Sequence, residues 1–144
     1  MPETLGSLCD KLTIVKLKQF HSKRSKRFES LHNQEVQLTE EINQYFSDAL
    51  SGLIPVDNLS FASNKVYKRA GMKTKLIKGH IGQVIAELAN VNCALWHEQE
   101  KVYDFTSIPV TEKDIVVKRL AILNLERNNC IDKINSRLTK SCTR

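Results

Sequence analysis

The sequence contains little glycine and proline, with five Gly and three Pro among 144 residues. Neither type occurs between Ser7 and Ser51, so no strong helix breaker interrupts that stretch. No run of 18 uncharged apolar residues is present, and we therefore expect no membrane span. The four cysteines form no Cys-x-x-Cys pair, which excludes the usual zinc and redox spacings. Because the first residues lack a secretory signal pattern, we expect reduced thiols and a cytoplasmic protein.

Apolar residues recur at spacings of three and four in four segments, and none alternates as a β-strand would. This pattern predicts a single all-α domain over residues 1–144, an antiparallel four-helix bundle built from two αα-hairpins. Hairpin 1 is expected at about 3–50 and hairpin 2 at about 79–140. The basic connector 51–78 is predicted to hold a short extra helix, which Asp57 or Asn58 would cap.

Two points of the architecture stay open at this stage. Residues 20–33 either form a turn between two helices or continue one long helix, since they contain no strong breaker. The pair Phe20-His21 matches Trp96-His97 at an offset of 76 residues, while Leu31 and later apolar positions match at an offset of 92. These matches suggest two related hairpins, but heptad-like patterns also produce such coincidences.

Basic residues are concentrated in two stretches that contain no acid, residues 11–28 and 58–86. Outside these two stretches the chain has nine basic residues and all 16 acids, so the rest of the chain is net acidic. Two basic patches attract anions such as nucleic acid, sugar nucleotides or an acidic protein surface, although a solvated helix face has the same composition. The candidate anion-binding residues are Lys23, Arg24, Lys26, Arg27, Lys65, Lys68, Arg69, Lys73, Lys75 and Lys78.

A second group of candidates lies near the end of the third predicted helix. Glu98 falls on the apolar seam, where a carboxylate needs a partner. His97 and Glu100 are three residues apart and share a helix face, the spacing with which bundle proteins supply two metal ligands. The alternative is that His97 is half-exposed and the glutamates are solvated. We predict no cofactor, with Mg²⁺ as the weaker alternative.

Arg127 occupies a position where the stripe of the fourth helix predicts an apolar residue. In an antiparallel hairpin it lies level with about residue 90, which predicts a polar layer in the middle of the bundle. Its members would be Asn90, Asn92, Asn124, Arg127 and Asn128. Such a layer either fixes helix register or lines a pocket in which the guanidinium binds a carboxylate or phosphate. Closer to the turn, Glu98 and Glu100 come level with Lys118 and Arg119.

Three segments, 8–17, 89–101 and 118–132, resemble short bacterial all-helical proteins of unknown function. Their related stretches read L-x-D-K-L-T-I-x-x-I-K, V-N-x-x-L-W-H-x-E-D and L-N-x-x-R-N-D. This chain has Glu100 where Asp is common and Asn129 in place of an acid, which weakens a metal site. Genes of such proteins often lie beside glycosyltransferase or surface-polysaccharide genes, so the resemblance implies a role in glycan biosynthesis.

These observations favour a non-enzymatic accessory protein with a protein partner, for which a glycosyltransferase is the expected class; a homodimer is also open. One alternative is a magnesium-dependent enzyme like the all-α nucleotide pyrophosphohydrolases, although their E-x-x-E and E-x-x-D spacings are missing. The other is nucleic-acid binding through the basic patches. The candidate ligand-binding residues are Asn92, His97, Glu98, Glu100, Lys118, Arg119, Asn124, Arg127 and Asn128.

Overall fold

The computed structural model describes residues 3–22, 26–61 and 74–143, and this part of the chain is all-helical without strands. The elements are α1 (Leu5–His21), α2 (Arg27–Ser51), η1 (Val56–Asn58), α3 (Ile81–Tyr103), η2 (Phe105–Ser107) and α4 (Val110–Cys142). The predicted all-α fold with four helices in two hairpins is confirmed. The connector contains the short 3₁₀ turn η1, which begins at Val56, next to the expected caps Asp57 and Asn58. Residues 62–73 of the predicted connector helix lie outside the described residues.

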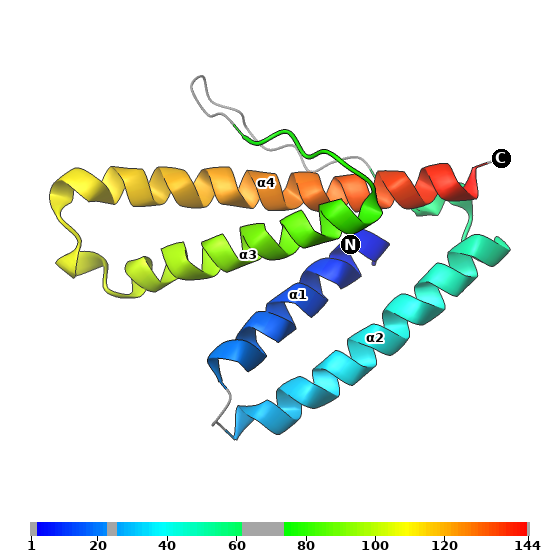
Figure 1. Cartoon of the computed structure of the whole chain (residues 1–144), viewed down its shortest axis with the longest axis horizontal. Coiled ribbons are helices and arrows are strands. Elements are labelled where there is room, and N and C mark those ends of the chain that lie inside the picture. The colour runs from blue at the N-terminus through cyan, green and yellow to red at the C-terminus, as the bar shows by residue number, and fades with distance from the viewer. Residues whose placement is uncertain (1–2, 23–25, 62–73, 144) are drawn as a thin grey trace.

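The two hairpins cross at an angle (Figure 1). Helix α1 runs antiparallel to α2, and α3 runs antiparallel to α4. Helix α1 lies at the centre, because it packs against each of the other three helices, whereas α2 packs chiefly on α1. The ends of α3 and α4 that η2 joins lie at the left of Figure 1, whereas the C-terminal ends of α2 and α4 both lie at the right.

The hydrophobic core follows the predicted stripes of α3 and α4, with Val84, Leu88, Cys130, Ile134 and Leu138 almost completely buried. Helix α1 contributes its first two turns, and α2 contributes Ala49 near its end. Connector residues Leu59 and Ile77 complete the core. The core therefore lies at the end of the molecule where all four helices converge.

The helix ends follow local chemistry. The Thr4 hydroxyl accepts a hydrogen bond from the Ser7 backbone amide at 3.2 Å and caps α1. Helix α1 ends at His21 and α2 begins at Arg27, so residues 20–33 do not form one continuous helix. Helix α2 ends at Ser51, and the next residue, Gly52, has a φ of 83° in the left-handed region that glycine adopts without strain.

Helices α1 and α4 approach each other most closely at Gly6. Its backbone amide donates a hydrogen bond to Oδ1 of the buried Asn135 at 2.8 Å. A Cβ atom at Gly6 would lie 2.4 Å from the carbonyl oxygen of Ile131, which is closer than packed atoms can approach. The absence of a side chain at this position is therefore what allows the two helices to touch.

Across the described residues, no helix combines the length and apolar character needed to cross a bilayer.

Candidate functional site

Four polar side chains from three helices meet where α1 crosses the α3–α4 hairpin. Arg127 on α4 donates from Nε to Oδ1 of Asp10 at 2.8 Å and from Nη2 to Oδ2, a two-pronged contact. Asn92 on α3 donates from its side-chain amide to Asp10 Oδ1 at 2.9 Å and to Thr13 Oγ1 at 2.7 Å. We call Asp10, Thr13, Asn92 and Arg127 the polar waist.

The polar waist differs in membership from the layer predicted from the sequence. Asn92 and Arg127 are part of it, whereas Asn90 and Asn124 are exposed and Asn128 is only half-buried. Neither exposed asparagine belongs to a buried layer, because each lies on the outer side of its helix. The sequence analysis missed Asp10, the partner of Arg127. A signal was present, since Asp10 is the only acid between residues 5 and 28.

The charges of the polar waist are paired inside the chain. The Asp10 side chain is 5% exposed, and both of its oxygens accept hydrogen bonds from Arg127. The hydrogen bond to Asp10 raises the pKa of the Arg127 guanidinium above its ordinary value. A ligand carboxylate or phosphate that took the same two-pronged position on the guanidinium would have to displace Asp10. The geometry therefore suits a device that fixes helix pairing.

Three segments that lie far apart in the sequence come together at the polar waist. Asp10 and Thr13 come from α1, Asn92 from α3 and Arg127 from α4. One hydrogen-bonded network thus joins residues that are 117 positions apart in the chain.

A second charged group lies near the α3–α4 turn. Glu98 is buried, and its Oε1 forms an ion pair with Arg119 Nε at 3.0 Å and accepts a hydrogen bond from Lys101 Nζ at 3.1 Å. The predicted level of Glu98 opposite Arg119 is thus confirmed, while Lys118 is exposed on the neighbouring position. Oε2 of Glu98 is buried without a hydrogen-bond partner. Two cations lie beside one carboxylate oxygen, so the negative charge of Glu98 is already compensated within the chain.

An aromatic cluster joins the end of α1 to α3. The His21 ring stacks on the Trp96 indole with centroids 4.7 Å apart and planes 3° from parallel. The Trp96 Nε1–H donates to Glu100 Oε1 at 2.8 Å. His97 Nδ1 lies 4.0 Å from Glu100 Oε2, and both side chains are exposed. The predicted His-x-x-Glu pair therefore forms, but Glu100 is shared with the indole.

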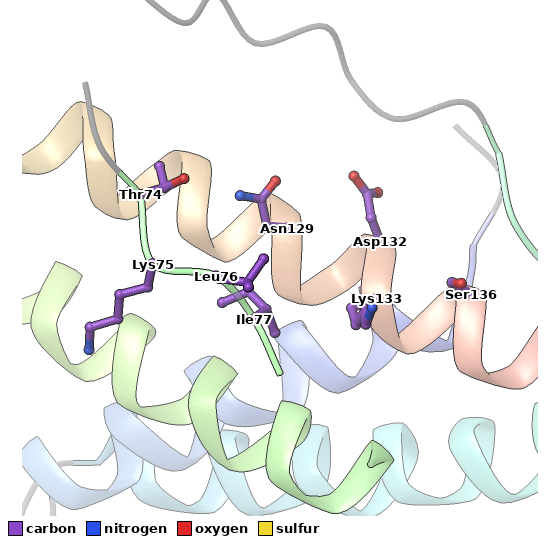
Figure 2. A pocket seen from close by; sticks show the side chains of 8 residues that line it. All are labelled: Thr74, Lys75, Leu76, Ile77, Asn129, Asp132, Lys133 and Ser136. Carbon is purple, nitrogen blue, oxygen red and sulfur yellow. The ribbon is translucent and has the colours of Figure 1, made fainter. Parts of the chain in front are cut away.

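Metal ligation is not favoured by this arrangement. Among the described residues, no three His, Cys, Asp or Glu side chains are grouped closely enough to hold an ion. Glu126, a buried carboxylate of α4, accepts a hydrogen bond from the backbone amide of Lys75 at 2.9 Å. Asp132, also on α4, lines a hollow beside residues 74–77 (Figure 2).

Residues 74–77 of the connector lie along α4 and enclose a hollow of about 480 Å³ (Figure 2). Thr74, Asn129, Asp132 and Ser136 contribute polar groups to it. Burial raises the pKa of the Asp132 carboxyl above its ordinary value. Lys75 is drawn to the acids of the bundle, because its Nζ lies 3.6 Å from Glu87 Oε1 and its amide binds a second carboxylate.

The two predicted basic patches are described only in part. Lys26 and Arg27 are exposed at the start of α2, and Lys75 and Lys78 are exposed beside the α3–α4 hairpin. The other candidates lie outside the described residues: Lys23, Arg24, Lys65, Lys68, Arg69 and Lys73.

All four cysteines are free thiols. Burial is the main cause that raises the pKa of Cys9 and of Cys130 to about 11. Neither thiol is therefore an activated nucleophile, which needs a lowered pKa.

No family model, curated protein or solved structure matches this chain.

Proposed function

We propose that this chain is a non-enzymatic accessory protein that binds a protein partner, and that this partner is a sugar-transferring enzyme of glycan biosynthesis. The family resemblance supports the biosynthetic context. The observation that supports a binding role is a row of exposed apolar side chains along α2, the helix that packs chiefly on α1 alone.

The buried polar groups support a structural role for the bundle interior. Buried carboxylates act in catalysis when they are poised to receive or release a proton, or to hold a substrate or metal. Here each buried carboxylate of the described residues has a partner in the chain: Asp10 has Arg127, Glu98 has Arg119 and Glu126 has the Lys75 amide. Because these carboxylates are paired inside the chain, we place the binding role on the surface of the protein.

The row on α2 consists of Phe28, Val36, Phe46 and Leu50, which we call the α2 strip. Their residues are between 42% and 56% exposed. At about 100° per residue, the four positions fall within an arc of about 80° on the helix. The strip borders the face of α2 that packs on α1, so it forms a continuation of the helix's apolar side. Aligned apolar side chains of this kind mark protein interaction sites more often than single exposed residues do.

The surroundings of the strip indicate the chemistry of the partner. Glu29 and Glu40 are exposed and follow the strip around the helix by about 20–40°. A partner helix or groove that covers the strip therefore needs an apolar centre and a Lys- or Arg-bearing rim on this side. A second copy of this chain related by twofold symmetry at α2 would instead place these carboxylates together, which disfavours α2–α2 homodimerisation.

The proposal is tested with a purified glycosyltransferase from the organism that makes this chain. Isothermal titration calorimetry measures binding by the wild-type protein, by Phe46→Ser/Leu50→Ser, and by the control Val117→Ser. Val117 is as exposed as Leu50 but lies on α4. We expect the double variant to lose at least tenfold in affinity and the control to bind as the wild type does.

Circular dichroism checks that the variants keep their helical content. We expect no loss, because substitutions at exposed positions change the free energy of unfolding by about 0.5 kcal/mol or less. No binding, or equal binding by the double variant, contradicts the proposal. Two further assays address the alternatives. A steep salt dependence in a DNA gel shift would point to nucleic-acid binding, and stabilisation by nucleotides only with Mg²⁺ would point to an enzyme.

A further inference from the structure

A hollow of about 330 Å³ opens where the end of α1, the start of α2 and Trp96 of α3 meet. Its wall combines Lys18 and Ser22 from the end of α1 with Arg27, Ser30 and Gln34 from α2. Buried Leu31 also lines it. The hollow is distinct from the polar waist and from the α2 strip.

The lining has a single sign of charge. Lys18 and Arg27 supply two cations, and no lining residue carries a carboxylate. Three other hollows of the described structure differ in this respect, since each includes an acid: Asp132 beside residues 74–77, Glu41 farther along the α1–α2 groove, and Glu87 beneath Lys75. Each of those three linings also has two lysines and is therefore net +1, whereas this hollow is net +2, so among the four it favours an anion most.

The Trp96 indole that lines the hollow is held in place by other residues of the chain. His21 stacks on Trp96, and Glu100 accepts the hydrogen bond from Nε1. Both contacts restrain the ring, so little conformational freedom would be lost when a ligand packs against it. The Gln34 side chain is likewise oriented, because its amide donates to Ser30 Oγ at 3.3 Å.

We propose that this hollow binds a phosphate monoester carried on a ring, as in a monosaccharide phosphate or a nucleoside monophosphate. The guanidinium of Arg27 and the ammonium of Lys18 suit the phosphate. The hydroxyls of Ser22 and Ser30 and the Gln34 amide suit the hydroxyls of a sugar ring. The indole offers apolar surface to the face of the ring. The volume is at the lower end of the range of about 300–1,000 Å³ for small-ligand sites, which fits one ring and one phosphate.

The hollow contains its own reporter, because Trp96 is the only tryptophan in the chain. Titrating the full-length protein with glucose 1-phosphate, UMP, inorganic phosphate and glucose, while recording tryptophan emission, measures binding at the site. Calorimetry repeats each titration in case emission is insensitive to a bound ligand. We expect saturable binding of at least one ring-bearing ester, at least tenfold tighter than that of inorganic phosphate or glucose. The stronger ester shows whether the ring is a sugar or a nucleoside.

A matched pair of variants tests the location. Arg27→Gln and Lys26→Gln remove the same charge from adjacent exposed positions, but only Arg27 lines the hollow. We expect Arg27→Gln to weaken binding roughly tenfold or more, as loss of a charge-assisted hydrogen bond does, and Lys26→Gln to bind as the wild type does. Failure of both esters to bind, equal binding of inorganic phosphate, or wild-type binding by Arg27→Gln overturns the proposal.

Discussion

Replacing Arg127 with methionine probes the polar waist most directly. Methionine replaces the apolar stem of arginine but leaves the Asp10 carboxylate buried, with only the Asn92 amide as a partner. Breaking a buried ion pair by removing one member costs about 3–5 kcal/mol. The Arg127 side chain is 34% exposed, so water screens part of the interaction. We therefore expect a loss of about 2–3 kcal/mol in the free energy of unfolding.

A double-mutant cycle separates the pair from its surroundings. Asp10→Leu removes the acceptor instead, and the combined variant Asp10→Leu/Arg127→Met leaves no unpaired buried charge. We expect the combined variant to lie within about 1 kcal/mol of the wild type, because apolar replacements of buried ion pairs are often neutral or stabilising. Urea unfolding followed by circular dichroism measures all four proteins. The coupling energy between the two positions should then be about 2 kcal/mol or more.

Arg119→Met serves as the control for losing a cation that pairs with a buried carboxylate. Its partner Glu98 keeps Lys101 at 3.1 Å, so we expect a loss of about 1 kcal/mol or less. Two results together would refute the structural role of the polar waist. Arg127→Met would leave the free energy of unfolding unchanged, and adding Asp10→Leu would not raise it. The guanidinium would then be free for another role, such as ligand binding.

Three further predictions concern packing, linkage and thiol chemistry. Gly6→Ala should lower the thermal midpoint, with a cost of about 1–3 kcal/mol, because its Cβ would overlap α4, whereas Gly82→Ala meets no atom within 4 Å and should be neutral or stabilising. Asp132 has a pKa raised by burial from 3.8, so the folded chain binds this proton more tightly than the unfolded chain, and stability falls as pH rises through that interval. Asp132→Asn should therefore increase the urea midpoint at pH 7, and the gain should disappear below about pH 3.8. Titration with a thiol reagent at pH 8 should label the two half-buried cysteines first, while Cys9 and Cys130, with pKa values of about 11, react only after denaturation.

The positions of the helices followed closely from the sequence, because apolar spacing and the scarcity of Gly and Pro are local properties. Each hairpin has the expected break between its helices, since α1 ends at His21 before α2 begins at Arg27, and α3 ends at Tyr103 before α4 begins at Val110. Helix α4 begins directly after Pro109, whose fixed φ and missing N–H suit the start of a helix.

The candidate site was predicted less completely. Arg127 stood out as a cation on an apolar stripe, and Glu98 as an acid on another, because each conflicts with its neighbours along one helix. Their partners come from hydrogen bonds between helices, and those depend on crossing angles that spacing along one helix does not contain. The same reason explains why Asn90 and Asn124 are not part of the polar waist. They were predicted at about the right height along the bundle, but their side chains are exposed.

The sequence by itself determined an all-helical chain, two hairpins, the apolar stripes that pack, and the few charged residues that must find partners among them. Only the tertiary structure decided that Asp10 meets Arg127, that α2 keeps an exposed apolar strip, and that Lys18, Arg27 and Trp96 line one hollow. The physical reason is sequence distance. Helix formation depends on residues three or four apart, whereas these interhelical contacts join positions from 69 to 117 residues apart, and the strip depends on which faces the crossing hairpins leave uncovered.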